Sequence, residues 1–102
     1  MMTVITRVKL KAGAENEWDE AMRERLKAAQ DQQGWLGGQL LVPAEGRNER
    51  AIVGIWQDRS HWESWHDDPA FKETRERMEG LQEAPDDMEW FDVVAEESNA
   101  TA

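Results

Sequence analysis

The chain of 102 residues contains no cysteine. Disulfide bonds, thiolate metal sites and a cysteine nucleophile are therefore excluded. Long apolar runs are also absent, because the opening MMTVITRVKLKAG is interrupted by charges and no stretch approaches the roughly 20 apolar residues that a membrane helix needs. From these absences we expect a cytoplasmic protein that is neither exported nor inserted in a membrane.

Positive charge is scarce in this sequence. Twelve Lys and Arg residues stand against 22 Asp and Glu, which gives a formal net charge of -10. Such a chain repels the phosphates of nucleic acids and anionic membrane surfaces, so we expect neither as a partner. The acidic pairs Asp67-Asp68 and Asp86-Asp87 lack the staggered spacing of a calcium loop and are better explained by capping and solvation. We predict no metal and no other cofactor.

The length fits one domain with a layer of sheet and a layer of helices, which we place at residues 1–95. Residues 96–102 are expected to form a disordered tail. Apolar alternation predicts a first strand from Thr3 to Leu10, with Thr6 on its core face. A helix follows from Glu15 to Gln32, and Gly34 is expected to end it. Its residues recur at helical spacing: Trp18, Ala21, Met22, Arg25, Leu26 and Ala29.

The chain after the first helix is expected to add three strands. Apolar runs from Trp35 to Val42 and from Arg50 to Gln57 flank a segment rich in turn-forming residues, which predicts a β-hairpin. A last strand is expected from Met88 to Ala95, after a turn that contains proline.

The stretch WQDRSHWESWHDDPAFKETRERM, residues 56–78, holds three of the six tryptophans and both histidines. Ser60 and Glu63 have the spacing of a capping box, which predicts that a short helix starts at Ser60. Asp68 followed by proline is a second start signal, so we expect a break near Asp67 and Asp68. The second half of this broken helix carries an apolar side: Phe71, Thr74, Met78 and Leu81.

The predicted order is strand, helix, strand, strand, helix, strand. This is the α+β, ferredoxin-like arrangement, an antiparallel sheet with its helices on one face. Both faces of the sheet are nevertheless apolar, so something must cover the second face. A second copy of the chain, packed sheet on sheet about a two-fold axis, is the expected cover, and we predict a homodimer. The apolar runs concerned are Leu40-Leu41-Val42, Ile52-Val53, Ile55-Trp56, Trp90-Phe91 and Val93-Val94.

The sequence resembles the antibiotic biosynthesis monooxygenase domain family over about residues 3–95. The resemblance is carried by the order of the elements, the opening VITRVKLKAG, the segment GWLGGQLL, and the pattern W-x5-W-x2-W-x3-P-x-F that begins at Trp56. It implies a dimeric α/β barrel with a pocket between the sheet and the helices of each subunit. It also implies oxidation of aromatic polyketides by oxygen without metal or flavin, as in some members, or haem degradation, as in others.

The resemblance to the haem-degrading members can be followed residue by residue. Those proteins carry an asparagine on the first strand, a tryptophan on the helix after the third strand, and an axial histidine ten residues beyond it. Without gaps these positions fall on Thr6, Trp65 and Arg75, and only the tryptophan matches. An arginine stays protonated and cannot ligate iron. His61 and His66 are possible substitutes, but their spacing on a short helix lets at most one face the pocket.

Three residues are candidates for contact with a substrate. Trp65 lies in the pocket of the family and can stack on a flat aromatic molecule, although core packing explains a buried tryptophan equally well. Phe71 is a second candidate, with the same alternative for it and for Trp56 and Trp62. Thr6 offers a hydroxyl to the pocket, but a threonine in a strand needs no function to explain it.

Two residues are candidates for catalysis. His66 can remove a proton from the substrate, because the pKa of histidine lies near neutrality; the alternative is an exposed side chain among Asp67 and Asp68. Arg75, one helical turn beyond Phe71, is placed to lean from the apolar face toward the mouth of the pocket and to hold a phenolate, enolate or carboxylate. The alternative is a solvated cation paired with Glu79 at i+4.

These observations predict a homodimeric, monooxygenase-like protein that binds a flat aromatic molecule and oxygen. Deprotonation of the substrate, by His66 or by a water, would be followed by its direct reaction with oxygen while Arg75 steadies the anion. Two alternatives stay open: a non-catalytic small-molecule-binding or stress-response module of the same fold, and haem degradation with an unfamiliar ligand.

Overall fold

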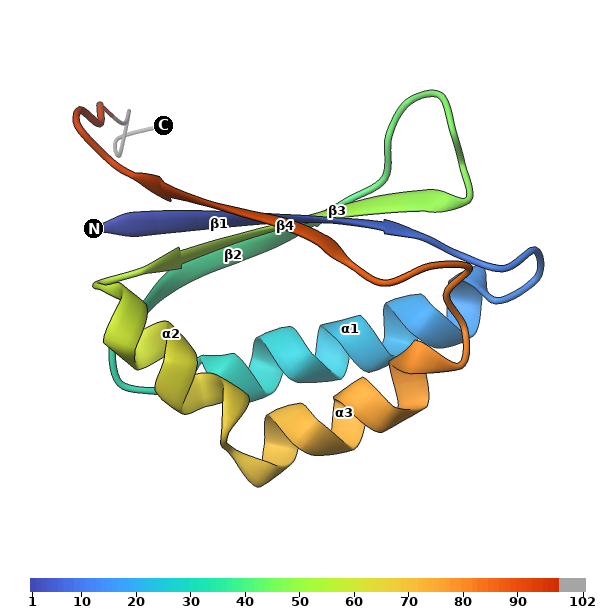
Figure 1. Ribbon diagram of the computed structural model, residues 1–102, viewed down its shortest axis with the longest axis horizontal. Coiled ribbons are helices and arrows are strands. Elements are labelled where there is room, and N and C mark those ends of the chain that lie inside the picture. Colours follow the sequence, from blue (N-terminus) through green and yellow to red (C-terminus); the bar gives the residue numbers. More distant parts are fainter. Residues whose placement is uncertain (98–102) are drawn as a thin grey trace.

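The computed structural model describes residues 1–97, so most of the tail expected at 96–102 lies outside the described residues. Its elements follow in the predicted order, with the second helix divided in two (Figure 1). They are β1 (Met2–Lys9), α1 (Glu15–Ala29), β2 (Trp35–Leu41), β3 (Glu49–Trp56), α2 (Arg59–His66), α3 (Pro69–Glu79) and β4 (Asp87–Asp92).

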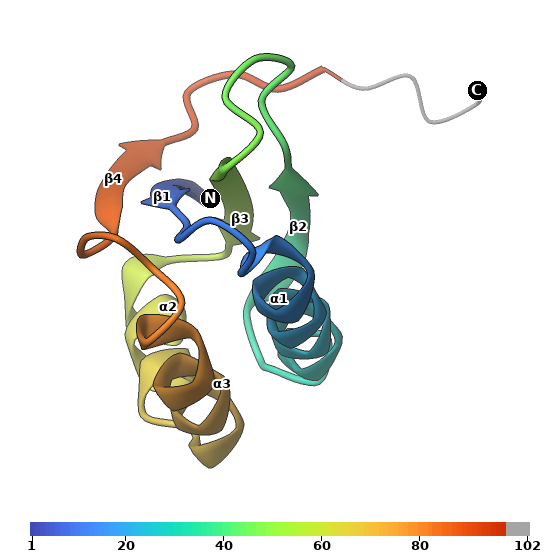
Figure 2. The same cartoon turned by 90° about the vertical axis from the view of Figure 1, so that its right-hand side faces the viewer.

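The strands form one antiparallel sheet in the order β2-β3-β1-β4. All the helices lie on one side of it (Figures 1 and 2), and Figure 2 shows α1 beneath β2 and the pair α2 and α3 beneath β4. This is the predicted ferredoxin-like α+β fold. Within residues 1–97, none of the helices is long and apolar enough to cross a membrane.

The face of the sheet that meets the helices carries the core. Val4, Val8 and Leu10 are buried on this side, as the alternation of the first strand predicts, while Thr6 is only half-buried between them. The buried apolar side chains form two clusters on either side of Thr6, so the strand position between the clusters is left open to a cavity. They are Met2, Val4, Ala29, Trp56, Trp65 and Phe71 in the first cluster and Val8, Leu10, Trp18, Ala21, Met22 and Met78 in the second.

The start of α2 differs from the prediction. The N-cap is Asp58, whose carboxylate accepts a hydrogen bond from the backbone N–H of His61 at 3.0 Å. The hydroxyl of Ser60 donates to the same carboxylate at 2.7 Å, and Glu63 pairs with Arg59 instead of reaching back to the cap. The prediction of a capping box at Ser60 and Glu63 is therefore wrong. Asp58, two residues before Ser60, already has the extended backbone that an N-cap needs.

The break between α2 and α3 is confirmed. Asp68 has an extended backbone, and its side chain accepts from the backbone N–H of Ala70 at 2.8 Å. Pro69 stands in the first turn of α3, where its missing N–H leaves no intrahelical bond unmade. The two helices therefore meet at an angle (Figure 1), which brings the last turn of α2 close to the first turn of α3.

Two predicted boundaries are corrected. The helix α1 ends at Ala29 with Gln30 as its C-cap, three residues before the predicted end and without help from Gly34. Gly34 instead has a φ of +85° at the entry to β2, and its carbonyl oxygen accepts from the backbone N–H of Gln57. The strand β4 ends at Asp92 rather than Ala95.

The second face of the sheet carries no helix of the described chain (Figure 1). Leu41 and Phe91 are 42% and 44% exposed there. Ile5, Val53 and Ile55 are partly exposed on the same face. The prediction of apolar side chains on both faces is therefore confirmed.

Candidate functional site

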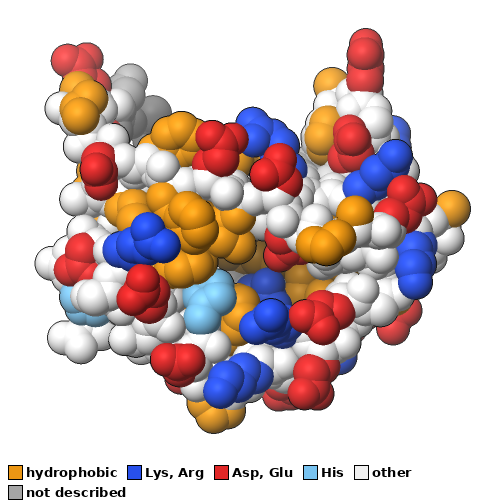
Figure 3. All heavy atoms as spheres, in the orientation of Figure 1, with side chains coloured by type: hydrophobic (Ala, Val, Ile, Leu, Met, Phe, Trp, Pro, Cys, Tyr) orange, Lys and Arg blue, Asp and Glu red, His pale blue; other side chains and the backbone are white. Residues whose placement is uncertain are grey.

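A cavity lies between the sheet and the helices at the level of Thr6. Its inner chamber, of about 90 Å³, is lined from the strands of the sheet, from α1, α2 and α3, and from the loop before β4. An outer chamber of about 570 Å³ shares Arg25, His66 and Phe71 with it and is bounded by α3 and the loop that ends at Asp86. Figure 3 shows the surface hollowed beneath the sheet, with histidine and positively charged side chains beside the hollow. The inner chamber alone is too small for a molecule of several rings, whereas clefts of about 300–1,000 Å³ take drug-sized ligands. Such a ligand would extend from one chamber into the other.

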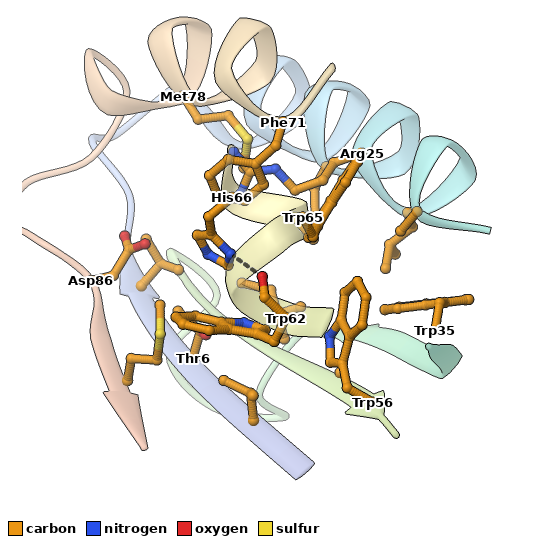
Figure 4. A pocket seen from close by; sticks show the side chains of 18 of the residues that line it. Thr6, Arg25, Trp35, Trp56, Trp62, Trp65, His66, Phe71, Met78 and Asp86 are labelled. Carbon is orange, nitrogen blue, oxygen red and sulfur yellow. Dashed lines mark hydrogen bonds between the residues drawn. The ribbon is translucent and has the colours of Figure 1, made fainter. Parts of the chain in front are cut away.

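Aromatic side chains form much of the wall. Trp65 packs edge-on against Phe71, with ring centroids 5.6 Å apart, and Trp35 packs in the same way on Trp56 at 5.2 Å. Trp65 is only 3% exposed and belongs to the first core cluster, yet it also lines the inner chamber (Figure 4). Core packing and contact with a ligand are therefore compatible interpretations for this residue, and for Phe71 as well.

His66, at the last residue of α2, enters the cavity. Its ring lies between Trp62 and Phe71, with centroid distances of 3.9 and 4.1 Å (Figure 4). The break before Asp68 produces this position, because α3 turns back and places Phe71 beside the end of α2. The alternative of a histidine exposed among the acidic residues at the break is not what the structure shows.

The hydrogen bond of His66 fixes which ring nitrogen is basic. Its Nδ1 lies 2.8 Å from the carbonyl oxygen of Trp62. A carbonyl oxygen only accepts, so Nδ1 carries the proton and Nε2 of the neutral ring is the basic atom. Burial lowers the pKa of His66 below its usual value, with Arg25 and Arg75 contributing in the same direction. The imidazole is therefore neutral and basic at pH 7.

Arg25 brings a positive charge to the same cavity from the middle of α1. Its guanidinium lies over the ring of Phe71, 4.2 Å from the centroid, and its Nε donates to Oγ1 of Thr74 at 2.9 Å. Figure 4 shows the side chain reaching from α1 toward Phe71. Burial lowers the pKa of Arg25 to about 10, so the side chain remains protonated at neutral pH.

The predicted site residues divide into two groups. Thr6, Trp65, His66 and Phe71 are brought together around the inner chamber. Arg75 is not among them: it lines only the outer chamber, its side chain is 60% exposed, and its Nε donates to Glu79 at 3.0 Å. Arg75 therefore has the geometry of the alternative interpretation, a solvated cation that pairs with Glu79 at i+4.

The prediction that at most one histidine faces the pocket is also confirmed. His61 lies outside both chambers, and its Nδ1 lies 2.8 Å from the carboxylate of Asp58. Sequence reasoning missed Arg25 and Asp86, which line both chambers. The signal for Arg25 was present in the sequence, because a cation stood on the apolar stripe of the first helix between Met22 and Leu26.

Comparison with known proteins agrees with this architecture. The family model described as antibiotic biosynthesis monooxygenase matches residues 1–77, most of the chain. The chain therefore belongs to the antibiotic biosynthesis monooxygenase family. A heme oxygenase (mycobilin-producing) from Mycobacterium tuberculosis is 30% identical over 66 residues, which are 65% of this chain and 63% of that protein. The chain thus aligns with less than two thirds of this relative's length.

Solved structures share the fold closely at low sequence identity. Rv0793 from Mycobacterium tuberculosis superposes with a TM-score of 0.86 at 16% identity, covering 95% of this chain and 98% of that one. SnoaB, a cofactor-independent oxygenase from Streptomyces nogalater, gives a TM-score of 0.83 at 17% identity and covers 93% of this chain and 94% of its own. At these identities the structures establish the common fold.

Proposed function

We propose that this protein is a small monooxygenase that oxygenates a flat aromatic substrate of quinol or polyketide type without metal or flavin. Membership of the family supports the reaction class, and SnoaB, described as cofactor-independent, shares the fold. The observation that carries the proposal is the placement of His66. A neutral imidazole with a basic Nε2, buried between aromatic rings at a cavity, is suited to removing a proton from an aromatic substrate.

The proposed reaction begins with transfer of a substrate proton to Nε2 of His66. The substrate anion gives electrons to molecular oxygen, and a carbon–oxygen bond forms to give a peroxide anion. This anion takes the proton back from Nε2 of His66 and becomes a hydroperoxide. Loss of water then leaves a carbonyl group, so that a ring CH₂ and one O₂ become C=O and one H₂O. Trp65 and Phe71 would hold the rings of the substrate, and the hydroxyl of Thr6 would bind a polar substituent.

Arg75 has a more distant place in this scheme. A role in steadying the substrate anion requires its guanidinium to leave Glu79 and turn into the outer chamber. The exposed pair at i+4 is worth only about 0.3–0.5 kcal/mol, so a bound anion can displace it. We therefore keep Arg75 as a residue of the cavity mouth.

We also propose that the protein is a homodimer. The helix-free face of the sheet is the surface concerned, since it exposes Leu41 and Phe91 beside Ile5, Val53 and Ile55. A flat apolar surface on an antiparallel sheet is self-complementary across a two-fold axis, which makes a second copy the fitting occupant.

Oxygen uptake with an anthrone tests the proposed reaction. With 1,8-dihydroxyanthrone as probe, the wild-type protein should consume one O₂ per molecule of anthraquinone formed, above the rate of a protein-free blank. His66→Gln should lower kcat by about 10²–10⁴-fold, the usual contribution of a general base. His61→Gln is the matched control, because this second histidine of α2 lies outside the cavity, and it should retain the wild-type rate. Trp65→Ala should raise KM.

The same experiment separates catalysis from simple binding. Quenching of tryptophan fluorescence by the anthrone, without oxygen uptake above the blank, would overturn the proposed reaction and favour the non-catalytic binding module. Equal rates for the wild-type protein and His66→Gln would remove His66 from the mechanism.

Haem degradation is a second candidate, favoured by the similarity to the heme oxygenase from Mycobacterium tuberculosis. Arg75, at the position of the family's axial histidine, cannot ligate iron. The only histidine lining the cavity in the described part of the chain is His66, and its Nε2 is the atom able to bind iron. Addition of haem should then give a shifted Soret band that His66→Ala abolishes; an unshifted band would eliminate this function.

A further inference from the structure

The side chain of Arg25 is held from two directions. Thr74, itself 5% exposed, accepts a hydrogen bond from Nε of Arg25 and donates its own proton to the carbonyl oxygen of Phe71 at 2.9 Å. The ring of Phe71 supports the flat face of the guanidinium at 4.2 Å. The two terminal nitrogens of Arg25, Nη1 and Nη2, are therefore already oriented before a ligand binds. The side chain then loses little rotamer entropy on binding.

Arg25 forms no ion pair, although the negative charge of Asp86 partly opposes the lowering of its pKa by burial. Among residues 1–97 no ion pair within 4.0 Å includes it, and its hydrogen bond goes to a neutral hydroxyl. Every fully buried side-chain nitrogen or oxygen in this part of the chain has a hydrogen-bond partner. Nη1 and Nη2 of Arg25 have none there, so they are not fully buried. These donors are therefore accessible from the cavity that Arg25 lines.

Carboxylates as well as cations line the chambers near Arg25. Asp86 lines the same chambers, but its carboxylate accepts a hydrogen bond from Gln82 at 2.6 Å and stays beyond ion-pair distance of Arg25. At the outer chamber Arg75 is paired with Glu79, and Glu83 is paired with Lys9, so among the cations that line the cavity in residues 1–97 Arg25 is the one without an ion pair. A partly buried cation that lacks a counter-ion is costly, and an oxyanion placed against it would remove that cost.

We propose that Arg25 selects the substrate of this cavity, and that this substrate carries an oxyanion, a carboxylate or ionised phenol, on its flat aromatic frame. The inference rests on the proposed binding of a flat aromatic molecule and adds its charge. It also transfers the anion-holding role from Arg75 to Arg25. The -10 net charge of the chain repels an anion at long range, so the attraction has to come from the local contact with Arg25.

Two probes of the same shape test the proposal. Anthraquinone-2-carboxylate and anthraquinone-2-carboxamide differ in charge but hardly in size, and quenching of tryptophan fluorescence measures the binding of both. The wild-type protein should bind the carboxylate about tenfold or more tighter than the amide, the usual effect of a hydrogen bond to a charged group. Equal affinity for the two probes would overturn the role of Arg25 while leaving the aromatic site intact. Binding of neither probe would overturn the proposed function as well.

Variants locate the selectivity. Arg25→Gln should abolish the preference for the carboxylate while retaining affinity for the amide. Arg23→Gln is the matched control, because it removes the same charge from an exposed position of α1, and it should keep the preference. Arg75→Gln should keep most of the preference for the carboxylate, and a complete loss in this variant would return the role to Arg75.

Thr74→Val tests the orientation of Arg25. It leaves the charge but removes the acceptor that orients Arg25, so it should reduce the preference several-fold. An unchanged preference in a folded Thr74→Val protein would contradict the preorganised guanidinium.

Discussion

Nδ1 of His66 lies 2.8 Å from the carbonyl oxygen of Trp62, one helical turn earlier on α2. Trp62 lies four residues before the end of α2, so its carbonyl oxygen is inside the helix, and the second lone pair of this oxygen holds the imidazole. The same bond sets the tautomer and keeps the ring against Phe71. The end of a short helix thus supplies both the orientation and the basicity of the proposed catalytic group.

The lowered pKa of His66 predicts a pH dependence of stability. Its folded-state pKa lies below the unfolded value of about 6.5, so the unfolded chain binds the additional proton and stability must fall as pH drops through about 6.5. Urea unfolding of the wild-type protein and of His66→Gln should therefore give a difference in unfolding free energy that is constant above pH 7.5 and shifts in favour of the variant between pH 6.5 and 5. A constant difference over the whole range would contradict the buried, neutral imidazole.

The ion pair of Arg50 and Asp19 predicts a large effect on stability. Arg50 is 5% exposed, and its Nε and Nη2 donate to the two carboxylate oxygens of Asp19 at 2.8 and 3.0 Å, which ties β3 to α1. Asp19→Asn leaves this buried guanidinium without its counter-charge and should lower the free energy of unfolding by about 3 kcal/mol. Glu79→Gln, which breaks the exposed pair with Arg75, should change it by less than about 0.5 kcal/mol in the same urea titration. Equal effects would show that burial of the Arg50 pair is unimportant.

The fold could be predicted from the sequence because its signals are local and agree with one another. Alternation in β1 shows which side is buried, and Asp68 with Pro69 gives the break in the second helix. Where two local signals competed, the sequence did not decide between them. Asp58 and Ser60 are both good N-cap residues, and the choice depends on where β3 ends and the chain turns, which is set by the sheet.

The site was predictable only in part. Thr6 and Phe71 could be named because each stands on a face that the periodicity turns inward, and Trp65 because the resemblance to the family places it in the pocket. Arg25 could not be given a role, because periodicity places it on a face of α1 but does not reveal that Thr74, far away in sequence, lies opposite. The burial of His66 likewise depends on the angle between α2 and α3, which no local pattern specifies.

The close approach of Gly34 to His61 can be tested by comparing two glycines with positive φ. Gly13 has a φ of +86° with open space around it, whereas a Cβ on Gly34, at +85°, would lie 2.5 Å from Cβ of His61. Gly13→Ala should cost about 1 kcal/mol from backbone strain alone. Gly34→Ala adds a clash that α2 must move to relieve, so its cost should exceed that of Gly13→Ala by about 1–3 kcal/mol. Thermal unfolding of both variants measures this difference in unfolding free energy. Equal losses would show that α2 moves at His61 without a measurable energetic cost.

The helix-free face of the sheet predicts the effect of a single charge on assembly. Val53 lies in the middle of this face on β3, where it pairs with Ile5 in the register of the sheet. In the proposed dimer a glutamate at this position would be buried against the second copy without a partner, which costs several kcal/mol. Val53→Glu should therefore sediment as a folded monomer at micromolar concentrations where the wild-type protein sediments as a dimer.

The matched control for this experiment is Ala44→Glu, which adds the same charge to the exposed loop between β2 and β3. This variant should remain dimeric, because the loop lies outside the sheet. Since Val53 faces away from the cavity, a monomeric Val53→Glu protein should still show quenching of its tryptophan fluorescence on binding anthraquinone-2-carboxylate. A wild-type protein that sediments as a stable monomer would contradict the dimer, and it would require the exposed Leu41 and Phe91 to serve another partner.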